Sequence, residues 1–145
     1  MVTGSEEKSV FSKFSKVDQI GIVVKDVEKS MKFYKKVFGV EPFPIVESAI
    51  NSAKLKIVLF ELGDVEIELI QVVEGKSIHS RFLEKRGEGL HHLGFFVKDL
   101  EKELVRLEKE GIKVLERGKV LGAVKFAYLD TEKTLGVVLE LIQYD

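Results

Sequence analysis

The segment Val17–Lys29 reads VDQIGIVVKDVEK, and the segment Leu90–Lys102 repeats it as LHHLGFFVKDLEK. A glycine, a valine and the residues Lys, Asp, Glu and Lys coincide between the two copies, which are offset by 73 residues (17 to 90). A second motif, ELIQ, occurs at Glu68–Gln71 and again at Glu140–Gln143, offset by 72 residues (68 to 140). Two motifs that recur at nearly one spacing indicate a duplicated module of about half the chain.

Each copy predicts the same order of elements. In the first copy, the β-branched strand Ile20–Val24 leads into a helix that Asp26 caps and Gly39 ends. Alternating apolar residues and turn signals place the remaining elements. The further strands are expected at residues 43–49, 55–62 and 65–73, then, after a linking helix at 77–86, a strand at 91–97, a helix at 100–110, and strands near 113–115, 125–129 and 137–143.

These elements predict an α+β fold of two tandem βαβββ modules, residues 17–73 and 90–143. The modules form a curved mixed sheet around a central cavity, with helices on the outer face. Residues 16–145 then make a single domain, and residues 1–15 form an N-terminal extension.

Composition excludes several classes of function. The 23 basic and 24 acidic residues give a net charge of −1, so there is no general attraction for nucleic acid or an anionic membrane. The longest apolar runs have the length of a strand and cannot span a bilayer. The first 16 residues lack the apolar stretch of a signal peptide, and we expect a cytoplasmic protein.

Strand alternation predicts where the polar residues of the repeat point. Gln19 shares a face with Gly21, and His92 shares a face with Gly94, while the opposite face of both strands is apolar. The apolar face packs under the helices, so Gln19 and His92 face the concave side. The repeated acids Glu68 and Glu140 lie within apolar strands, where a carboxylate is costly unless it is paired or bound to a cation.

Two carboxylates, an imidazole and an amide oxygen form a hard ligand set for a divalent ion such as Co, Mn, Ni, Zn or Mg. A six-coordinate ion would keep two positions open for a substrate that chelates through neighbouring oxygens. Such an ion favours proton movement at a carbon next to a carbonyl. The alternative is structural: an acid in a strand often faces water, and Gln19 and His91 are then solvated or hydrogen-bonded polar residues.

The chain resembles the vicinal oxygen chelate superfamily over residues 17–143. This superfamily includes glyoxalase I, extradiol dioxygenases, bleomycin-binding proteins and methylmalonyl-CoA epimerases. Phe82–Leu93, which reads FLEKRGEGLHHL, is similar to the linker and strand of the epimerases, as is Gly122–Ala127, which reads GAVKFA.

The resemblance implies a metal site of Gln19, Glu68, His92 and Glu140. It also implies that Glu140 is both a ligand and a proton shuttle, with Glu47 as a second acid on the other side of the substrate carbon. The expected substrate is a small molecule, an acyl thioester, and the expected assembly is a homodimer.

Two departures keep other functions open. Gln19 stands where the family usually has histidine, and a neutral amide oxygen binds transition ions more weakly than imidazole. Asp130–Lys133 stands where the epimerases tend to have His-Pro-Lys. The alternatives to an epimerase are a lyase of the glyoxalase I type and a metal-free small-molecule binding protein of the bleomycin-resistance type.

Overall fold

A computed structural model describes Phe14 and residues 16–41, 44–120 and 123–144. Most of the predicted N-terminal extension, residues 1–15, lies outside the described residues, and the division at residue 16 stays a prediction. The described elements are β1 (Gln19–Val23), α2 (Val27–Phe38), β2 (Val46–Ile50), β3 (Ala53–Leu62), β4 (Val65–Glu74), α3 (Ile78–Arg86), β5 (Gly89–Phe96), α4 (Leu100–Lys109), β6 (Val114–Val120), β7 (Val124–Leu129), α5 (Glu132–Leu135) and β8 (Val138–Gln143).

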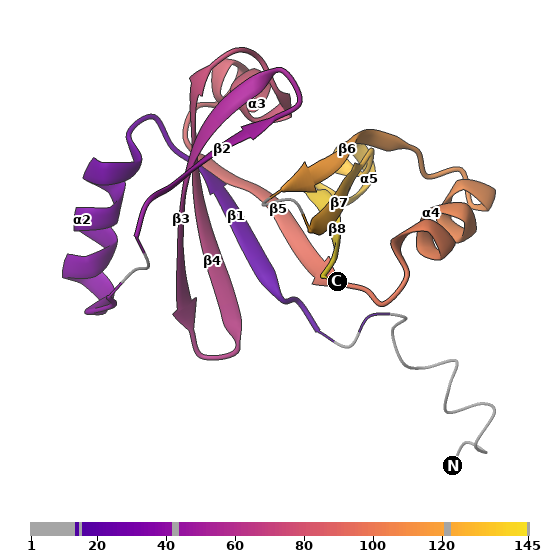
Figure 1. Ribbon diagram of the computed structural model, residues 1–145, viewed down its shortest axis with the longest axis horizontal. Helices are drawn as coiled ribbons and strands as arrows, with labels where there is room; N and C mark the ends of the chain where they lie inside the picture. The colour runs from indigo at the N-terminus through magenta and orange to yellow at the C-terminus, as the bar shows by residue number, and fades with distance from the viewer. Residues whose placement is uncertain (1–13, 15, 42–43, 121–122, 145) are drawn as a thin grey trace.

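The strands form one mixed sheet in the order β2-β3-β4-β1-β5-β8-β7-β6, which confirms the predicted pair of βαβββ modules. Each module contributes four neighbouring strands, and its first strand is parallel to its last: β1 to β4, and β5 to β8. The modules meet where β1 runs antiparallel to β5 (Figure 1). The equivalent strands therefore occupy equivalent places on either side of this central pair.

Helices α2 and α4 cover the outer face of the two modules, on opposite sides of the molecule (Figure 1). Ile20 and Ile22 of β1 pack into the apolar cluster beneath α2, and Phe95 of β5 packs into the cluster beneath α4. The predicted assignment of the apolar strand face to the helices is confirmed.

The last residue of each ELIQ motif holds a helix in place. Gln71 accepts a hydrogen bond from the backbone N–H of Val27 at 2.9 Å, and Gln143 accepts the equivalent bond from Leu100 at 2.8 Å. Both N–H groups lie in the first turn of a helix, where the chain offers them no intrahelical acceptor. The repeated glutamine is thus structural, and it ties the C-terminal end of β4 or β8 to the helix of the same module.

The sheet curves until its two edge strands approach each other. Asn51, in the turn after β2, donates from Nδ2 to the backbone oxygen of Arg117 on β6 at 3.3 Å. Asn51 has a φ of 53°, a left-handed conformation that asparagine tolerates better than most residues. This contact closes one side of the space that the strands surround.

Three elements differ from their prediction. Strand β2 begins at Val46, and residue 43, the first of the predicted strand, lies outside the described residues. Strand β6 extends to Val120, beyond the predicted residues 113–115. Edge strands often carry polar and charged side chains, so the alternation of apolar residues does not reveal their full length. The short helix α5 was not predicted, and it has no counterpart between β3 and β4.

No helix within the described ranges combines the length and the apolar character that crossing a bilayer requires.

The central strand pair is packed across two glycines. Gln19 lies opposite Gly94, and Gly21 lies opposite His92, so each polar residue of one module faces the repeat glycine of the other. A Cβ added at Gly21 would overlap the imidazole ring of His92, and one at Gly94 would meet Gln19 Cβ at 3.0 Å. His92 can lie flat across β1 only because Gly21 has no side chain.

We expect Gly21→Ala to displace the His92 ring and to lower the free energy of unfolding by about 1–3 kcal/mol, the usual cost of overpacking a core. Denaturant unfolding in the presence of chelator measures this loss. Gly94→Ala is the matched variant, and its cost should be smaller because its neighbours need to shift by only a few tenths of an ångström. Equal stability of Gly21→Ala and the unsubstituted chain would contradict the packing described.

Candidate metal centre

The structure brings the four predicted ligands together around His92, which is fully buried. Nε2 of His92 lies 3.2 Å from Glu68 Oε1, 3.2 Å from Glu140 Oε1 and 3.3 Å from Gln19 Oε1. These residues come from β5, β4, β8 and β1, the four central strands of the sheet. The duplication therefore places Gln19 beside its counterpart His92, and Glu68 beside its counterpart Glu140.

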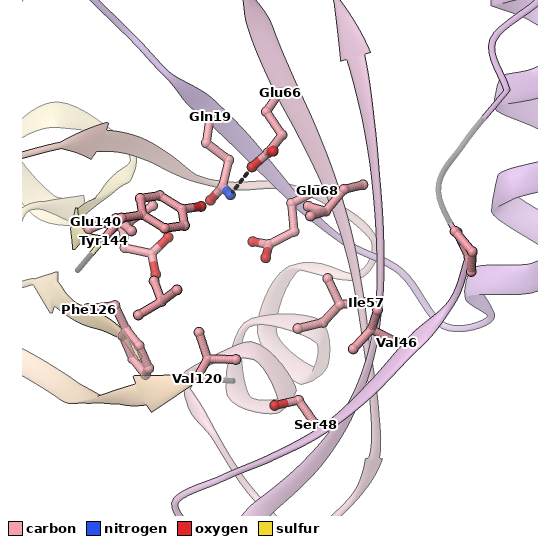
Figure 2. A pocket seen from close by; sticks show the side chains of 14 residues that line it. Gln19, Val46, Ser48, Ile57, Glu66, Glu68, Val120, Phe126, Glu140 and Tyr144 are labelled. Carbon is pink, nitrogen blue, oxygen red and sulfur yellow. Dashed lines mark hydrogen bonds between the residues drawn. The ribbon is translucent and has the colours of Figure 1, made fainter. Parts of the chain in front are cut away.

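A hydrogen bond from Gln19 to Glu66 sets the orientation of the Gln19 amide. Gln19 Nε2 donates to Glu66 Oε1 at 2.8 Å (Figure 2). The amide oxygen Oε1 is therefore the atom that faces His92 Nε2, at 3.3 Å. Glu66 lies opposite Gln19 in the parallel pairing of β1 with β4. Gln19 thus presents an oxygen, the atom that can bind a cation, to the centre of the site.

Two buried carboxylate oxygens of this group have no hydrogen-bond partner. They are Glu68 Oε1 and Glu140 Oε1, the atoms that face His92. A single N–H at His92 Nε2 cannot satisfy two carboxylate oxygens and an amide oxygen, and leaving such oxygens unpaired in a core is costly. These orphaned atoms fit a cation at the point toward which all four side chains converge.

The spacing of the donor atoms also fits a divalent ion. The ligand atoms of Glu68, His92 and Glu140 lie within 4.8 Å of one another. Adjacent corners of an octahedral ion with ligands at about 2.1 Å are about 3 Å apart, close to the separations around His92. Two carboxylates, one imidazole and one amide suit Mn, Co, Ni, Zn or Mg.

Three of the four side chains, Gln19, Glu68 and Glu140, line a cavity of about 130 Å³. His92 lies within 3.3 Å of all three through its Nε2. Its wall is mostly apolar and includes Val46, Ile57, Val120 and Phe126 (Figure 2). Glu66, Glu68 and Glu140 are its acidic residues, and the described residues of the wall include no lysine or arginine. The electrostatic potential of this cavity therefore favours a cation.

Glu47 lies apart from the other predicted residues. Alternation on β2 turns Val46 and Ser48 into the cavity, whereas Glu47 is exposed opposite Lys56 of β3. Its role as a second acid stays a prediction that the geometry does not favour. Glu66 was not among the predicted site residues, although Glu66 and Glu68 are two residues apart on one strand and so share a face.

His92 and the neighbouring carboxylates influence one another's protonation. Burial by itself lowers the pKa of His92, but Glu140 and Glu68 raise it to about 9. Burial also raises the pKa of Glu68, and the nearby charge of His92 partly offsets that effect. Without a metal ion, a proton on His92 is therefore the cation that balances the two carboxylates near neutral pH.

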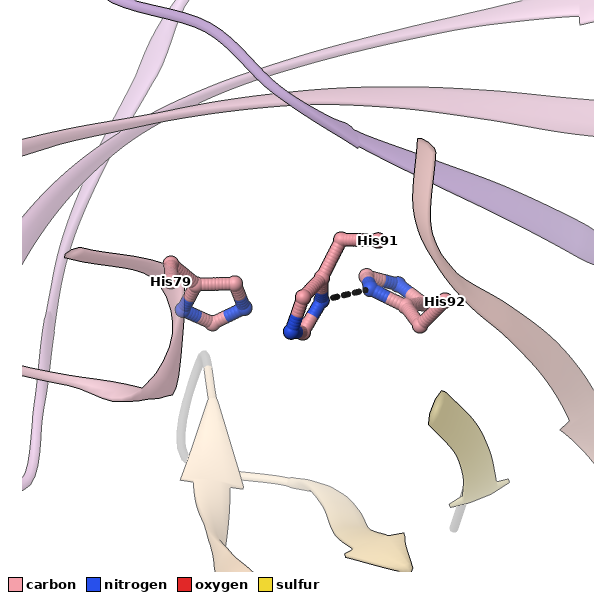
Figure 3. Close-up of side chains that lie close together, drawn as sticks. All are labelled: His79, His91 and His92. Atoms are coloured by element: carbon pink, nitrogen blue, oxygen red, sulfur yellow. Dashed lines mark hydrogen bonds between the residues drawn. The ribbon is translucent and has the colours of Figure 1, made fainter. Parts of the chain in front are cut away.

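A second group of histidines consists of His79, His91 and the candidate ligand His92, and Figure 3 shows how the three rings lie. Hydrogen bonds already engage most of its ring nitrogens. His79 bonds Tyr128 Oη at 3.1 Å and Ser77 Oγ at 3.3 Å, and His91 Nδ1 bonds His92 Nδ1 at 2.9 Å. Rings that satisfy one another in this way form a supporting network and not a second metal centre.

The family model of the glyoxalase/bleomycin resistance protein/dioxygenase superfamily matches residues 18–128. The chain is 30% identical to the uncharacterized protein YqjC of Bacillus subtilis over 131 residues, which cover 89% of this chain and 92% of that protein. It is 28% identical to the mitochondrial methylmalonyl-CoA epimerase of Bos taurus over 134 residues, which cover 88% of this chain and 74% of the relative.

Solved structures share the fold. A variant of the methylmalonyl-CoA epimerase of Streptomyces coelicolor, in complex with 2-nitronate-propionyl-CoA, superposes with a TM-score of 0.73 at 23% identity. The superposition covers 91% of this chain and 96% of that one.

Metal binding should release a proton from His92. Because the pKa of His92 is raised to about 9, its Nε2 is protonated at pH 7–8 and must lose that proton before it can bind an ion. We expect about one proton released per ion, and an apparent affinity that rises roughly tenfold per pH unit from pH 7 to pH 9 and then levels off. Calorimetry in buffers of different ionisation enthalpy counts the protons.

His92→Gln is the control for this measurement, since its amide has no titrating proton. It should bind ions more weakly and release none. A binding enthalpy of the unsubstituted chain that is the same in every buffer would contradict a protonated His92 in the metal-free state.

Proposed function

Because this chain belongs to the glyoxalase/bleomycin resistance protein/dioxygenase superfamily, we propose that it is a metal-dependent enzyme of the epimerase type, which moves a proton at the carbon next to a thioester carbonyl. The observation that carries the proposal is the pair of buried, unpartnered carboxylate oxygens that converge with Gln19 and His92 beside an apolar cavity. Relatives named methylmalonyl-CoA epimerase support this type of reaction.

Gln19, Glu68, His92 and Glu140 would hold the ion. A divalent ion bound there would supply Lewis-acid chemistry, because it lowers the energy of negative charge on a carbonyl oxygen while the neighbouring carbon loses its proton. The apolar wall keeps water from the reacting carbon, which strengthens every electrostatic interaction inside the cavity.

Glu140 would accept the proton and return it. Only its Oε1 faces His92, so its second carboxylate oxygen is available to exchange a proton with the substrate. Tyr128 lies opposite Glu140 in the pairing of β7 with β8, and its pKa is raised well above its usual value by burial and by the charges of Glu140 and Glu68. Tyr128 therefore stays protonated beside this carboxylate.

The volume of the cavity limits what it can take. A pocket that encloses a whole drug-sized ligand measures roughly 300–1,000 Å³, whereas this one measures about 130 Å³. It suits the short acyl end of a thioester, and the carrier would lie outside. An acyl-CoA such as methylmalonyl-CoA is therefore the substrate to test first.

A lyase of the glyoxalase I type is the second candidate, and the position of Glu47 favours it. Inversion at a carbon needs proton transfer on two opposite sides, but Glu47 lies outside the cavity. Transfer of a proton between neighbouring carbons on one side needs only Glu140. A metal-free binding protein stays the third reading, and the expected homodimer stays a prediction.

The test is exchange in deuterium oxide. Purified protein, loaded in turn with Co, Mn, Ni, Zn or Mg, is incubated with racemic methylmalonyl-CoA, and proton NMR follows the α-proton against a control with the ion alone. Enzyme-dependent exchange supports proton abstraction, and exchange at equal rates into both enantiomers supports epimerisation. Lack of exchange, together with turnover of the hemithioacetal of methylglyoxal and glutathione, would favour the lyase.

The roles of the two carboxylates should separate by mutation. Glu140→Gln should lower the exchange rate roughly 10²–10⁴-fold even with saturating metal, because an amide oxygen can bind an ion weakly but cannot accept a proton. Glu68→Gln, its counterpart in the other module, should mainly weaken metal binding and recover its rate when more metal is added. Equal loss of rate in both variants, at equal metal content, would argue against the shuttle role of Glu140.

A further inference from the structure

His91 adjoins the candidate ligand His92 and is almost as deeply buried, with 2% of its surface exposed. Its Nδ1 lies 2.9 Å from Nδ1 of His92 (Figure 3). Neighbouring residues of a regular strand point to opposite faces, so this contact requires an irregularity.

The irregularity is a β-bulge in β5. In the pairing with β1, Gly21 lies opposite His92 but Ile22 lies opposite Leu90, so His91 is an extra residue without a partner. A bulge redirects the side chain of the extra residue. It brings His91 to the side of His92, where its ring packs against those of Phe82 and His79, each at 5.0 Å between ring centroids.

Only one hydrogen atom can lie between Nδ1 of His91 and Nδ1 of His92. Two ring nitrogens at 2.9 Å form a hydrogen bond only if one carries hydrogen and the other has a free lone pair. Either His92 donates to His91, or His91 donates to His92.

The surroundings of His92 Nε2 indicate which of the two rings donates the hydrogen bond. Nε2 of His92 faces three oxygens, and a cation can bind among them only if this nitrogen offers a lone pair. A neutral imidazole with a free Nε2 carries its proton on Nδ1. His92 therefore donates, and Nδ1 of His91 accepts.

We infer that His91 is the positioning residue of the metal centre: its Nδ1 accepts the proton of His92 Nδ1 and so keeps the Nε2 lone pair of His92 directed at the ion. This inference rests on the metal-dependent function proposed above. His91 itself is then neutral and carries its proton on Nε2. In most metal sites, a carboxylate or a backbone carbonyl accepts the hydrogen bond from the second ring nitrogen of a ligand histidine. Such acceptors fix both the tautomer and the orientation of the ring.

Gln19 has a matching partner. Glu66 accepts from Gln19 Nε2 and turns the amide oxygen inward, as His91 turns Nε2 of His92 inward. The equivalent of Glu66 in the second module is Val138, opposite His92. The side chain of Val138 cannot accept a hydrogen bond, and His91, at the bulge, supplies the acceptor for His92.

Nitrogen NMR of the histidine rings tests the tautomers directly. In zinc-loaded protein we expect His92 to be protonated only on Nδ1 and His91 only on Nε2. In metal-free protein at pH 7, His91 should keep the same tautomer beside a doubly protonated His92. A proton found on Nδ1 of His91 would overturn the inference in either state.

Two substitutions of His91 test the consequence for metal affinity. His91→Asn keeps an acceptor oxygen near the position of Nδ1 and should retain the affinity within about threefold. His91→Leu keeps the bulk but removes the acceptor and should lose roughly 10–100-fold, as do other changes to the outer partners of metal ligands. Calorimetric titration with zinc measures both. Phe82→Leu, which alters packing against the His91 ring but leaves its Nδ1 in place, is the control that should retain affinity.

Equal affinity of the Leu and Asn variants would overturn the inference. If the Leu variant does not fold, the tautomers of the unsubstituted protein decide the question. An unsubstituted protein that binds no divalent ion would refute the proposed function, but the tautomer of His91 in the metal-free protein would still test its contact with His92.

Discussion

Close packing of strands β1 and β5 is the constraint on which the rest of the structure depends. The ring of His92 lies over Gly21, and the side chain of Gln19 lies by Gly94, so the two modules approach more closely than larger residues would allow. Because β4 and β8 are bound to the outer sides of this pair, Glu68 and Glu140 come within hydrogen-bonding distance of the same imidazole. A small spacing at the centre of the sheet thus creates a site from four strands.

The candidate site also requires that the strands carrying Glu68 and Glu140 are held firmly in place. Each ELIQ motif contains an acid for the site and, three residues later, a glutamine that binds the first turn of a helix. Odd spacing puts these two side chains on opposite faces of the strand, the acid toward the cavity and the glutamine toward the helix. One short motif therefore joins the inner and outer layers of the domain.

Much of this arrangement could be predicted, because the repeat and strand alternation are local properties of the sequence. They place Gln19, Glu68, His92 and Glu140 on matching strands and faces. Glu66 could have been found by the same rule. His91 could not, since its direction depends on a register shift between strands that are distant in sequence. Glu47 was expected from the resemblance, but the alternation of β2 turns Ser48 inward in its place.

The near-symmetry of the two modules has a consequence for how the cavity distinguishes one orientation of a ligand from the other. Had both central strands kept the same polar residue, the site would have two equivalent ends, and a bidentate ligand could enter in either sense with equal energy. Gln19 with Glu66 at one end, and His92 with His91 at the other, break this equivalence. Divergence of the two copies after duplication therefore gives a nearly symmetric frame two unlike ends, so that a bidentate ligand has one preferred orientation in the cavity.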